Sequence, residues 1–423
     1  MLDIKFIKEH PDLIKEAARK KHLDFDVSAL LEVEEKRAAA QREFEALRTE
    51  QNKLGEEIPK ATDPVVRAKL IEDLKPLKEK VQAAEEQVKV VMKDWQALML
   101  QVPNIPDMTV PEGEDDTGNV ETKVWGDKPV FSFTPKDHIA LMESLGMADF
   151  EKGTAVAGFR GYFLKGDGAL LEFALHQFVV DHFRNNKKDY EFMIVPSLVR
   201  RETLFGTGYL PQGEDDMYRT QDNDYFSGTA EVATMSYFAD TVIEESAFPI
   251  KKLAFAPAFR REAGSHSKDT KGLFRVHEFR KFEQVILCEA NHETSVQLHE
   301  ELLGNAEEIL QALGLHYHVV INCGGDLGLG QVKKYDIEAW VPSQETFRET
   351  HSCSYFHDFQ TRRLNIRYRD AEGKLRYAHS LNNTALAMPR ILQHLVENYQ
   401  QADGTIKVPE VLKPYIGKDY LGK

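Results

Sequence analysis

Two long apolar repeats in the first hundred residues constrain the fold of this chain more than any other feature of its sequence. In each repeat the spacing of the apolar positions alternates between three and four residues, which is the heptad seam of a coiled coil. The first seam comprises Leu30, Val33, Arg37, Ala40, Phe44, Leu47, Gln51, Leu54 and Ile58. The second comprises Leu70, Leu74, Leu77, Val81, Ala84, Val88, Val91, Trp95 and Leu98.

The segment 59–64, Pro-Lys-Ala-Thr-Asp-Pro, separates the two seams and ends both helices. Two seams joined by a short turn predict an antiparallel coiled-coil hairpin, with a first arm about 45 Å long. Pro76 lies inside the second seam and predicts a kink or a helix restart. Such a hairpin has little core of its own, so we expect it to project and contact a partner. Nearly balanced charges at its tip leave open an arm that only dimerises or only separates domains.

Composition and cysteine usage limit the class of protein. The 423 residues suffice for two or three domains, and the net charge of −15 argues against broad adhesion to nucleic acid or anionic membranes. Cys288, Cys323 and Cys353 are widely spaced without a CxxC pair, which indicates a reducing compartment and no zinc site. Neither a signal peptide nor an apolar run of membrane-spanning length is found. We therefore expect a soluble, cytoplasmic protein without membrane contact.

The composition divides the chain into three parts. Residues 1–102 form the helical N-terminal domain, residues 103–128 form a linker rich in proline and acidic residues, and residues 129–423 mix helix and strand. Strands are predicted around 254–259, 278–288, 316–321, 335–341 and 364–368. Helices are predicted at 137–145, 168–185, 292–313 and 387–400. Strands from separated places with helices set apart from them predict an α+β fold with a mostly antiparallel sheet.

The segment Phe259–Glu283 carries fixed charges on sequence that is typical of two strands around a polar loop. A rigid platform of this kind can hold a polyanionic substrate. An amphipathic hairpin whose charged face is only solvated would have the same sequence pattern. The sequence contains no GxxxxGK[ST] loop, no HExxH and no nucleophile elbow. The glycine-rich run 324–330 fails the dinucleotide fingerprint and predicts a turn with close packing. A bound nucleotide would therefore be held by side chains on strands.

Three further clusters could carry chemistry. Gly228-Thr229-Ala230-Glu231 opens an apolar helix, where Thr229 could equally be a simple cap. In the segment Glu338–Ser354, the oxygens of Glu349 and Ser352 suit Mg²⁺, a hard ion that usually shares substrate phosphates. In the segment Leu381–Arg390, polar residues precede a helix, and Arg390 could reach a phosphate or pair with a carboxylate.

Taken together, these clusters resemble the seryl-tRNA synthetases, class II aminoacyl-tRNA synthetases of the common bacterial and eukaryotic type. The resemblance covers essentially the whole chain. The helix–strand–proline segment 168–196 resembles class II motif 1, Phe259–Glu283 resembles motif 2, and His379–Gln400 resembles motif 3. Thr229-Ala230-Glu231 and Ser352-Cys353-Ser354 resemble segments more particular to the serine enzyme.

The resemblance implies a role for each matching residue. The catalytic arginines would be Arg260 and Arg390. ATP would be bound by Arg260, Arg261, Glu262, Val276, Phe279, Glu349, Thr350, His351, Ser352 and Arg390. Serine would be bound by Thr229, Ala230, Glu231, Arg260, Glu283, Asn382 and Thr384. Glu349 and Ser352 would hold Mg²⁺ against the phosphates of ATP, without zinc.

The implied reaction has two steps: activation of L-serine by ATP to seryl-adenylate, then transfer to the 3′ end of tRNA(Ser), with tRNA(Sec) left open. The resemblance also implies a homodimer, and a coiled coil that grips tRNA by shape. Loop 264–272 would close over ATP. Arg280 and His351 depart from the usual pattern, and so does Asn383-Thr384-Ala385. A ligase that charges a carrier protein and a noncatalytic tRNA-binding protein are the alternatives; the retained charged residues argue against the second.

Overall fold

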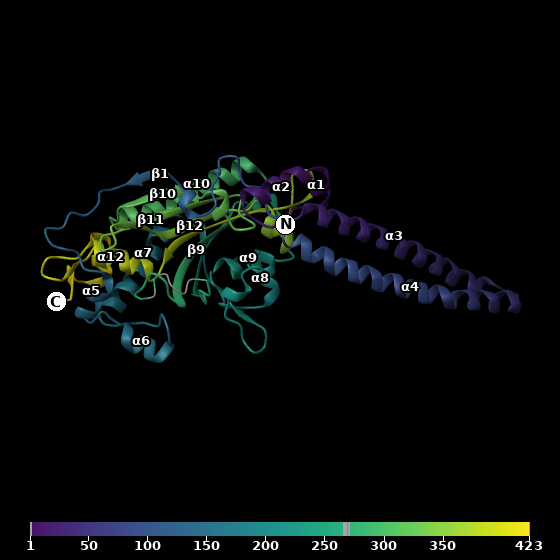
Figure 1. Cartoon of the computed structure of the whole chain (residues 1–423), viewed down its shortest axis with the longest axis horizontal. Helices are drawn as coiled ribbons and strands as arrows, with labels where there is room; N and C mark the ends of the chain where they lie inside the picture. Colours follow the sequence, from purple (N-terminus) through teal and green to yellow (C-terminus); the bar gives the residue numbers. More distant parts are fainter. Residues whose placement is uncertain (1, 265–268, 270, 423) are drawn as a thin grey trace. The chain divides into compact units, whose positions relative to one another are not determined.

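The structure is a computed structural model that describes residues 2–264, 269 and 271–422 (Figure 1). The chain forms two compact units, Met1–Pro103 and Asn104–Lys423. Among the described residues, no helix is both long enough and apolar enough to cross a membrane.

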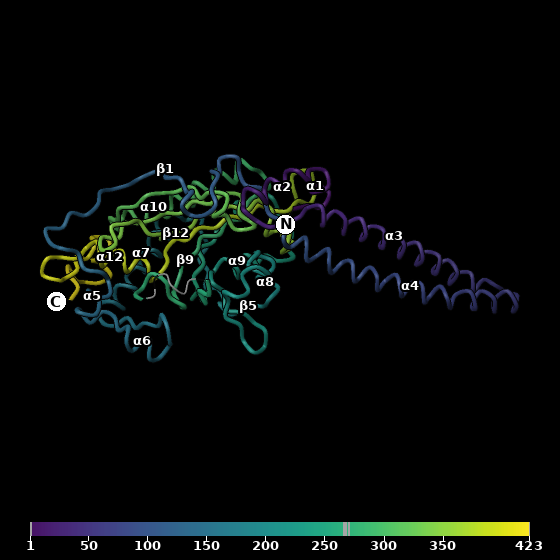
Figure 2. The backbone as a smooth tube through the Cα atoms, viewed as in Figure 1, coloured from purple at the N-terminus to yellow at the C-terminus, as the bar shows by residue number. Residues whose placement is uncertain are grey.

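The N-terminal unit contains the predicted hairpin. Two short helices, α1 (Ile4–Glu9) and α2 (Pro11–Lys20), precede the long helices α3 (Val27–Glu57) and α4 (Pro64–Met99). Each long helix begins at an aspartate whose carboxylate accepts a main-chain hydrogen bond, Asp26 from Ser28 and Asp63 from Val65. A 3₁₀ turn, η1 (Ile58–Lys60), lies between α3 and α4, and the backbone trace shows the two helices side by side (Figure 2). The predicted coiled-coil hairpin is confirmed.

The hairpin seam contains a polar contact at Arg37, a seam position that is usually apolar in a heptad pattern. Arg37 donates from Nε to Glu34 on the same helix at 2.7 Å, and its guanidinium lies 5.2 Å from the ring centroid of Trp95 on α4. Leu30 is fully buried and Leu77 is nearly so. Of the two outcomes expected at Pro76, a kink or a helix restart, the restart is not found, because α4 runs unbroken through it. The continuous α4 shows that the loss of one main-chain hydrogen bond at Pro76 does not end the helix.

The second unit is built on an eight-stranded sheet in the order β1-β10-β11-β12-β15-β9-β8-β4. All neighbours are antiparallel except β4 and β8, which are parallel. The strands are β1 (Val120–Trp125), β10 (Tyr317–Ile321), β11 (Lys333–Val341), β12 (Thr346–Tyr355), β15 (His379–Ala387), β9 (Glu278–Cys288), β8 (Ile250–Phe259) and β4 (Tyr190–Ile194). The predicted α+β fold is thereby confirmed.

Helices and small sheets surround this central sheet. The helices are α5 (His138–Ser144), α6 (Phe150–Ala157), α7 (Asp167–Asn186), α8 (Arg201–Thr207), α9 (Glu231–Ser236), α10 (His292–Ala312), α11 (Phe359–Arg363), α12 (Arg390–Asn398) and α13 (Lys413–Ile416). The small strands are β2 (Ala148–Asp149) with β3 (Phe163–Leu164), β5 (Leu198–Val199) with β6 (Tyr225–Phe226), β7 (Val242–Glu244) with β13 (Arg367–Arg369) and β14 (Leu375–Tyr377), and β16 (Ile406–Lys407) with β17 (Tyr420–Leu421).

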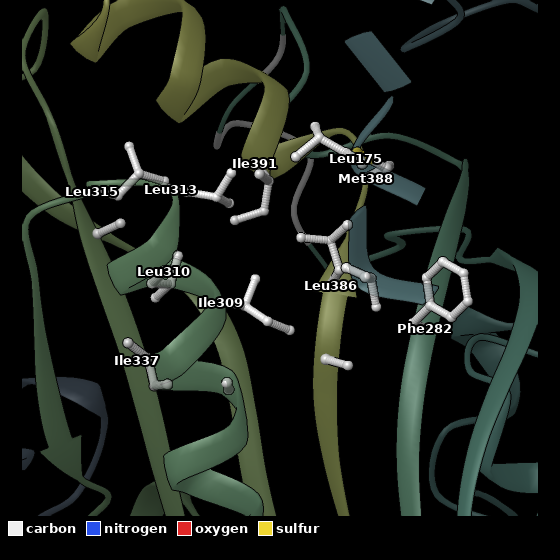
Figure 3. Packing of buried hydrophobic residues seen from close by; sticks show 14 of the residues in the cluster. Leu175, Phe282, Ile309, Leu310, Leu313, Leu315, Ile337, Leu386, Met388 and Ile391 are labelled. Carbon is white, nitrogen blue, oxygen red and sulfur yellow. The ribbon is translucent and has the colours of Figure 1, made fainter. Parts of the chain in front are cut away.

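The main core lies between α10 and the sheet. Figure 3 shows Ile309 and Leu310 of α10 beside Ile337 of β11 and Leu386 of β15, and all four are fully buried. Ile391 of α12 belongs to the same cluster. Burial of such side chains contributes about 1.5–3 kcal/mol each. The adjacent interior strands β15, β9 and β8 contribute to this core and therefore form a rigid support for their polar side chains.

Two segments differ in detail from the elements expected from sequence. The stretch 364–368, predicted as a strand, overlaps only the start of the short β13 (Arg367–Arg369), which pairs outside the main sheet. The stretch 103–128, predicted as a linker, contains the edge strand β1. At its start, the side-chain amide of the buried Asn104 donates to the carbonyls of Gly330 at 3.0 Å and Phe356 at 2.7 Å. This stretch therefore packs as part of the second unit.

Candidate active site

A cavity of about 360 Å³ in the second unit collects side chains from separated segments of the chain. It is lined by residues from β9, β12 and β15, from the first turns of α9 and α12, and by Arg260, which directly follows β8. The predicted site residues that line it are Thr229, Glu231, Arg260, Glu262, Val276, Phe279, Glu283, Glu349, Thr350, Ser352, Asn382, Thr384 and Arg390. The motif 2 and motif 3 segments and the two smaller clusters thus meet in one place, whereas no residue of the motif 1 segment 168–196 lines the cavity.

Two buried carboxylates form one part of the cavity. Glu283 on β9 is directly opposite Thr384 on β15 in the strand register, and it lies 2.5 Å from the ammonium of Lys281. Burial raises the pKa of Glu283, although the charge of Lys281 opposes this shift. Glu231, at the start of α9, accepts hydrogen bonds from the Tyr209 hydroxyl at 2.8 Å and the Gln360 amide at 2.6 Å. Both carboxylates are therefore held in fixed orientations.

Arg390, the first residue of α12, forms a second part of the cavity. Its Nη1 donates to the Glu349 carbonyl at 3.0 Å and lies 3.3 Å from the Glu349 carboxylate. Its Nε donates to the Phe274 carbonyl at 3.1 Å, and its guanidinium stands 4.5 Å from the Phe274 ring centroid. Burial would raise the pKa of Glu349, but the positive charges of Arg390, Lys334 and Arg260 lower it overall. Glu349 is therefore a carboxylate at neutral pH.

Arg260 connects these two parts. It follows β8 directly, its Nε donates to the Gly228 carbonyl at 3.4 Å, and its guanidinium lies 5.4 Å from the ring centroid of Phe279. Its charge acts on the pKa of Glu283 and on that of Glu349. A guanidinium between a pair of buried carboxylates and a second arginine can bind an anion that joins the two parts of the cavity.

Glu262 is held by an unusual backbone and by an ion pair. Its φ of 56° is in the left-handed region, which is rare for a residue with a side chain. Its carboxylate accepts a hydrogen bond from Arg275 Nη1 at 2.5 Å. Burial would raise the pKa of Glu262, but Arg275 and other nearby arginines lower it overall. The carboxylate is therefore an ionised hydrogen-bond acceptor at the cavity wall.

A β-bulge explains why neighbouring residues of β12 can both face the cavity. The register of β11 and β12 shifts between Ile337 and Glu338, which pair with His351 and Glu349 respectively. Thr350 is the extra residue of the bulge, so the usual alternation of side chains is interrupted here. Glu349, Thr350 and Ser352 consequently all line the cavity.

Three predicted residues do not line the cavity. Ala230 is buried beside it, and Arg261 donates from Nη1 to the Asp215 carbonyl at 3.1 Å on an exposed surface. His351 is buried behind Thr350, 2.9 Å from its hydroxyl, and burial lowers the pKa of His351 to about 4. The departure at Arg280 is also away from the cavity, because Arg280 pairs with Glu172 of α7 at 2.9 Å. Loop 264–272 lies largely outside the described residues.

The cavity also contains residues for which the sequence analysis assigned no role. Tyr209, Phe274, Lys281, Gln331 and Gln360 all line it. Lys281 could have been proposed from the sequence as one of the charged residues of the motif 2 segment, but no pattern indicated that it pairs with Glu283. No sequence pattern indicates Gln360, because Glu231, to which it donates a hydrogen bond, is 129 positions away in the chain.

Comparisons with known proteins agree with this arrangement. Residues 1–106 match the seryl-tRNA synthetase N-terminal domain, and residues 216–399 match the class II tRNA synthetase core domain (G, H, P, S and T). A serine–tRNA ligase from Deinococcus radiodurans is 46% identical over 100% of this chain and 99% of its own length.

Solved structures give the same result. The seryl-tRNA synthetase from Pyrococcus horikoshii, in complex with ATP, superposes with a TM-score of 0.90 at 36% identity, covering 100% of this chain and 99% of its own. The cytoplasmic serine–tRNA ligase from Naegleria fowleri, in complex with AMP, superposes with a TM-score of 0.85 at 32% identity, covering 100% of this chain and 98% of its own.

An antiparallel sheet that carries an arginine after one strand and a second arginine at the start of the following motif 3 helix defines a class II aminoacyl-tRNA synthetase. The N-terminal hairpin and the full-length similarity specify the amino acid. The chain belongs to the seryl-tRNA synthetase family, and its activity is the ligation of serine to tRNA with ATP as the energy source.

Proposed function

We propose that Arg260 binds the serine carboxylate and the α-phosphate of ATP together, at the point where the first bond forms. The observation that supports this role is its position between the Glu231–Glu283 pair and the Glu349–Arg390 pair. A planar guanidinium can contact two oxygen anions at once and thereby reduce their repulsion. Catalysis by this residue would consist of positioning and charge stabilisation.

The serine subsite lies at the two buried carboxylates. Glu231, whose two oxygens are already oriented by Tyr209 and Gln360, would bind the ammonium group, with Thr229, Ala230 and Asn382 beside it. Glu283 and Thr384, which face each other across β9 and β15, would bind the hydroxyl. A buried site built around a hydroxyl rejects alanine, because its polar groups would be left without partners.

The ATP subsite lies at the arginine side of the cavity. Phe279 would stack on the adenine, with the backbone near Val276 along its edge, and Glu262 would accept from its amino group. Arg390 would bind the γ-phosphate, with Thr350 lining the nucleotide. His351, which touches the Thr350 hydroxyl, would act by orienting Thr350. Arg261 would contribute to ATP binding indirectly, through its hydrogen bond to the Asp215 carbonyl.

Glu349 and Ser352 fit a magnesium ion that is shared with the phosphates. They offer a carboxylate and a hydroxyl, which are the hard oxygen donors that Mg²⁺ prefers. Within the described residues, no group of three histidine, cysteine, aspartate or glutamate side chains could hold a metal by itself. A donor set of this size suits an ion that takes its other ligands from ATP and water. When bound, the ion would neutralise charge on the phosphates.

The reaction proceeds without a covalently modified residue. The serine carboxylate attacks the α-phosphorus of ATP, and the bond to the β-phosphate oxygen breaks, giving seryl-adenylate and pyrophosphate. Arg260 holds the two reacting groups in contact, and Arg390 orients the leaving pyrophosphate. The 3′-terminal adenosine hydroxyl of tRNA then attacks the acyl carbon and releases AMP.

The remaining assignments concern the whole molecule. We propose that residues 1–102 bind the tRNA by its shape through the α3–α4 hairpin, that residues 103–128 connect this domain to the rest, and that residues 129–423 catalyse the reaction in a cytoplasmic homodimer. Recognition of RNA by shape needs few specific side chains on the hairpin. Charging assays with tRNA(Ser) and tRNA(Sec) test whether both are substrates.

Serine-dependent ATP–pyrophosphate exchange tests the site directly. Thr384→Val keeps the shape of the side chain and removes its hydroxyl, so the KM for serine should rise about 10- to 100-fold while the KM for ATP changes little. Thr361→Val, at a second buried threonine that does not line the cavity, is the matched control. Exchange supported by alanine or threonine but not by serine would contradict the proposed subsite.

A further inference from the structure

A buried histidine–glutamate pair connects the segment that leaves the motif 2 loop with the motif 3 helix. His138 begins α5, Glu397 lies near the end of α12, and their exposed fractions are 4% and 0%. The Glu397 carboxylate accepts from His138 Nδ1 at 2.9 Å, from the His138 main-chain N–H at 3.0 Å and from the Ser343 main-chain N–H at 3.2 Å. Burial would raise the pKa of Glu397, but these hydrogen bonds lower it overall. Glu397 is therefore a fixed, ionised acceptor.

The hydrogen bonds determine which imidazole nitrogen of His138 carries the proton. The main-chain N–H of Leu273 points at His138 Nε2 at a distance of 3.1 Å. A peptide N–H can only donate, so Nε2 must present its lone pair. The proton therefore lies on Nδ1, where it is donated to Glu397. The imidazole thus holds Leu273 through one nitrogen and is itself oriented through the other.

The residue before Leu273 has to be glycine for this contact to form. Gly272 has a φ of 82°, and a Cβ atom built there would lie 2.2 Å from His138 Nε2. That distance is well inside van der Waals contact, and the positive φ disfavours any residue with a side chain. The close approach of the main chain to the imidazole is therefore built into the sequence at this position.

Leu273 leads directly to the arginine side of the cavity. Leu273 is fully buried, and the carbonyl of the next residue, Phe274, accepts the hydrogen bond from Arg390 Nε at 3.1 Å. Two guanidinium groups contact the Phe274 ring, that of Arg348 at 3.8 Å and that of Arg390 at 4.5 Å from its centroid. Arg390 contacts this main chain directly, and Glu397, two turns further along the same helix, is connected to it through His138.

We propose that His138 is a positioning residue for ATP activation: together with Glu397 it fixes Leu273, and thereby sets Phe274 and Arg390 in the orientation that engages the nucleotide. The inference rests on the proposed contact of Arg390 with ATP. His138 itself does not line the cavity, so its effect is transmitted through the main chain of 273–274. If His138 had a purely structural role, its substitution would lower stability without changing the KM for ATP more than the KM for serine.

Two conservative variants separate the two hydrogen bonds of the imidazole. His138→Gln reaches the position of Nε2 and keeps an acceptor for Leu273, whereas His138→Asn reaches only the position of Nδ1 and keeps a donor for Glu397. Exchange kinetics should show the KM for ATP raised about five- to tenfold in His138→Asn and less in His138→Gln, with the KM for serine within about twofold. Gly272→Ala, whose Cβ would push Leu273 and the imidazole apart, should resemble His138→Asn.

The controls distinguish this inference from its alternatives. His316→Gln changes another buried histidine, whose Nδ1 bonds the Trp125 carbonyl at the sheet edge, and should lower the melting temperature without moving the KM for ATP. Equal changes in both KM values, or no difference between the Asn and Gln variants, would overturn the positioning role. Arg390→Ala is measured in parallel. An unchanged KM for ATP there would overturn the ATP contact of Arg390, and the present inference with it.

Discussion

Arginine–glutamate pairs occur in both units of the protein, but they differ in how far they reach along the chain. In the hairpin, Arg37 pairs with Glu34 one helical turn away, and the nearby Trp95 completes the contact. In the cavity, Arg390 pairs with Glu349, 41 positions away and on a different kind of element. The hairpin pair stabilises a structure that the apolar seam already specifies. The cavity pair joins strand β12 to the motif 3 helix α12, in addition to the pairing of β12 with β15.

The difference predicts opposite consequences for the two steps of the reaction. Changes in the cavity should stop adenylate formation and leave tRNA binding intact, because they alter a few buried charges. Changes in the hairpin should leave adenylate formation intact, because the hairpin residues contribute nothing to the cavity lining.

The largest effect is expected for Arg260→Ala. Loss of the guanidinium removes the cation between the serine carboxylate and the α-phosphate, so exchange should fall by at least about 10³-fold. The Kd for tRNA(Ser), measured by filter binding, should change by less than about twofold. Arg260→Lys should recover little, because an ammonium cannot contact two anions in the planar geometry of arginine. Exchange close to that of the wild type in Arg260→Ala would refute the assignment.

Deletion of residues 33–98 tests the other side of the comparison. The shortened protein should form seryl-adenylate with exchange kinetics within a few-fold of the full chain, and its charging of tRNA(Ser) should be lost because the tRNA is no longer held. The rates of exchange and of charging are measured on the same preparation, and the ratio of charging to exchange should fall relative to the full chain. A shortened protein that still charges tRNA would show that the hairpin does not bind it.

The same difference in sequence separation between contacting residues explains what could be predicted from the sequence. The hairpin was predictable because each seam residue contacts neighbours at fixed spacing, and the period alone determines the pairing. The motif segments could be located because they are contiguous. The bonds of Gln360 to Glu231 and of Leu273 to His138 join residues more than a hundred positions apart, and no local pattern encodes them. The helix restart, one of the two outcomes expected at Pro76, does not occur, and a local rule for proline does not include the contacts that α4 makes with α3.

A smaller effect is expected from the buried histidine behind the cavity. Burial lowers the pKa of His351 to about 4, below its ordinary value of 6.5. The folded state therefore favours the neutral imidazole, and its contribution to stability is complete above pH 6.5 and is lost as the pH falls toward 4. Between pH 7 and pH 5 this amounts to about 2 kcal/mol. In His351→Ser, urea unfolding should show a correspondingly smaller loss of stability over that interval.

His316→Ser is the control for the loss of a buried histidine side chain as such, because His316 is buried and bonds the Trp125 carbonyl, away from the cavity. An unchanged pH dependence in His351→Ser would show that the imidazole is not desolvated as its burial indicates.

The smallest effect is expected at Arg37, and it decides whether the hairpin pair is only local. Arg37→Met keeps an extended side chain against Trp95 but leaves the nearly buried Glu34 without its cation. Since Arg37 is partly exposed and the pair is within one helix, thermal unfolding should show a loss of only about 1 kcal/mol. Glu34→Gln combined with Arg37→Met should restore most of it, because no unpaired charge then remains. Exchange should be unchanged in both variants. A decrease in exchange would mean that the hairpin and the cavity are coupled, and the separation of their roles would fail.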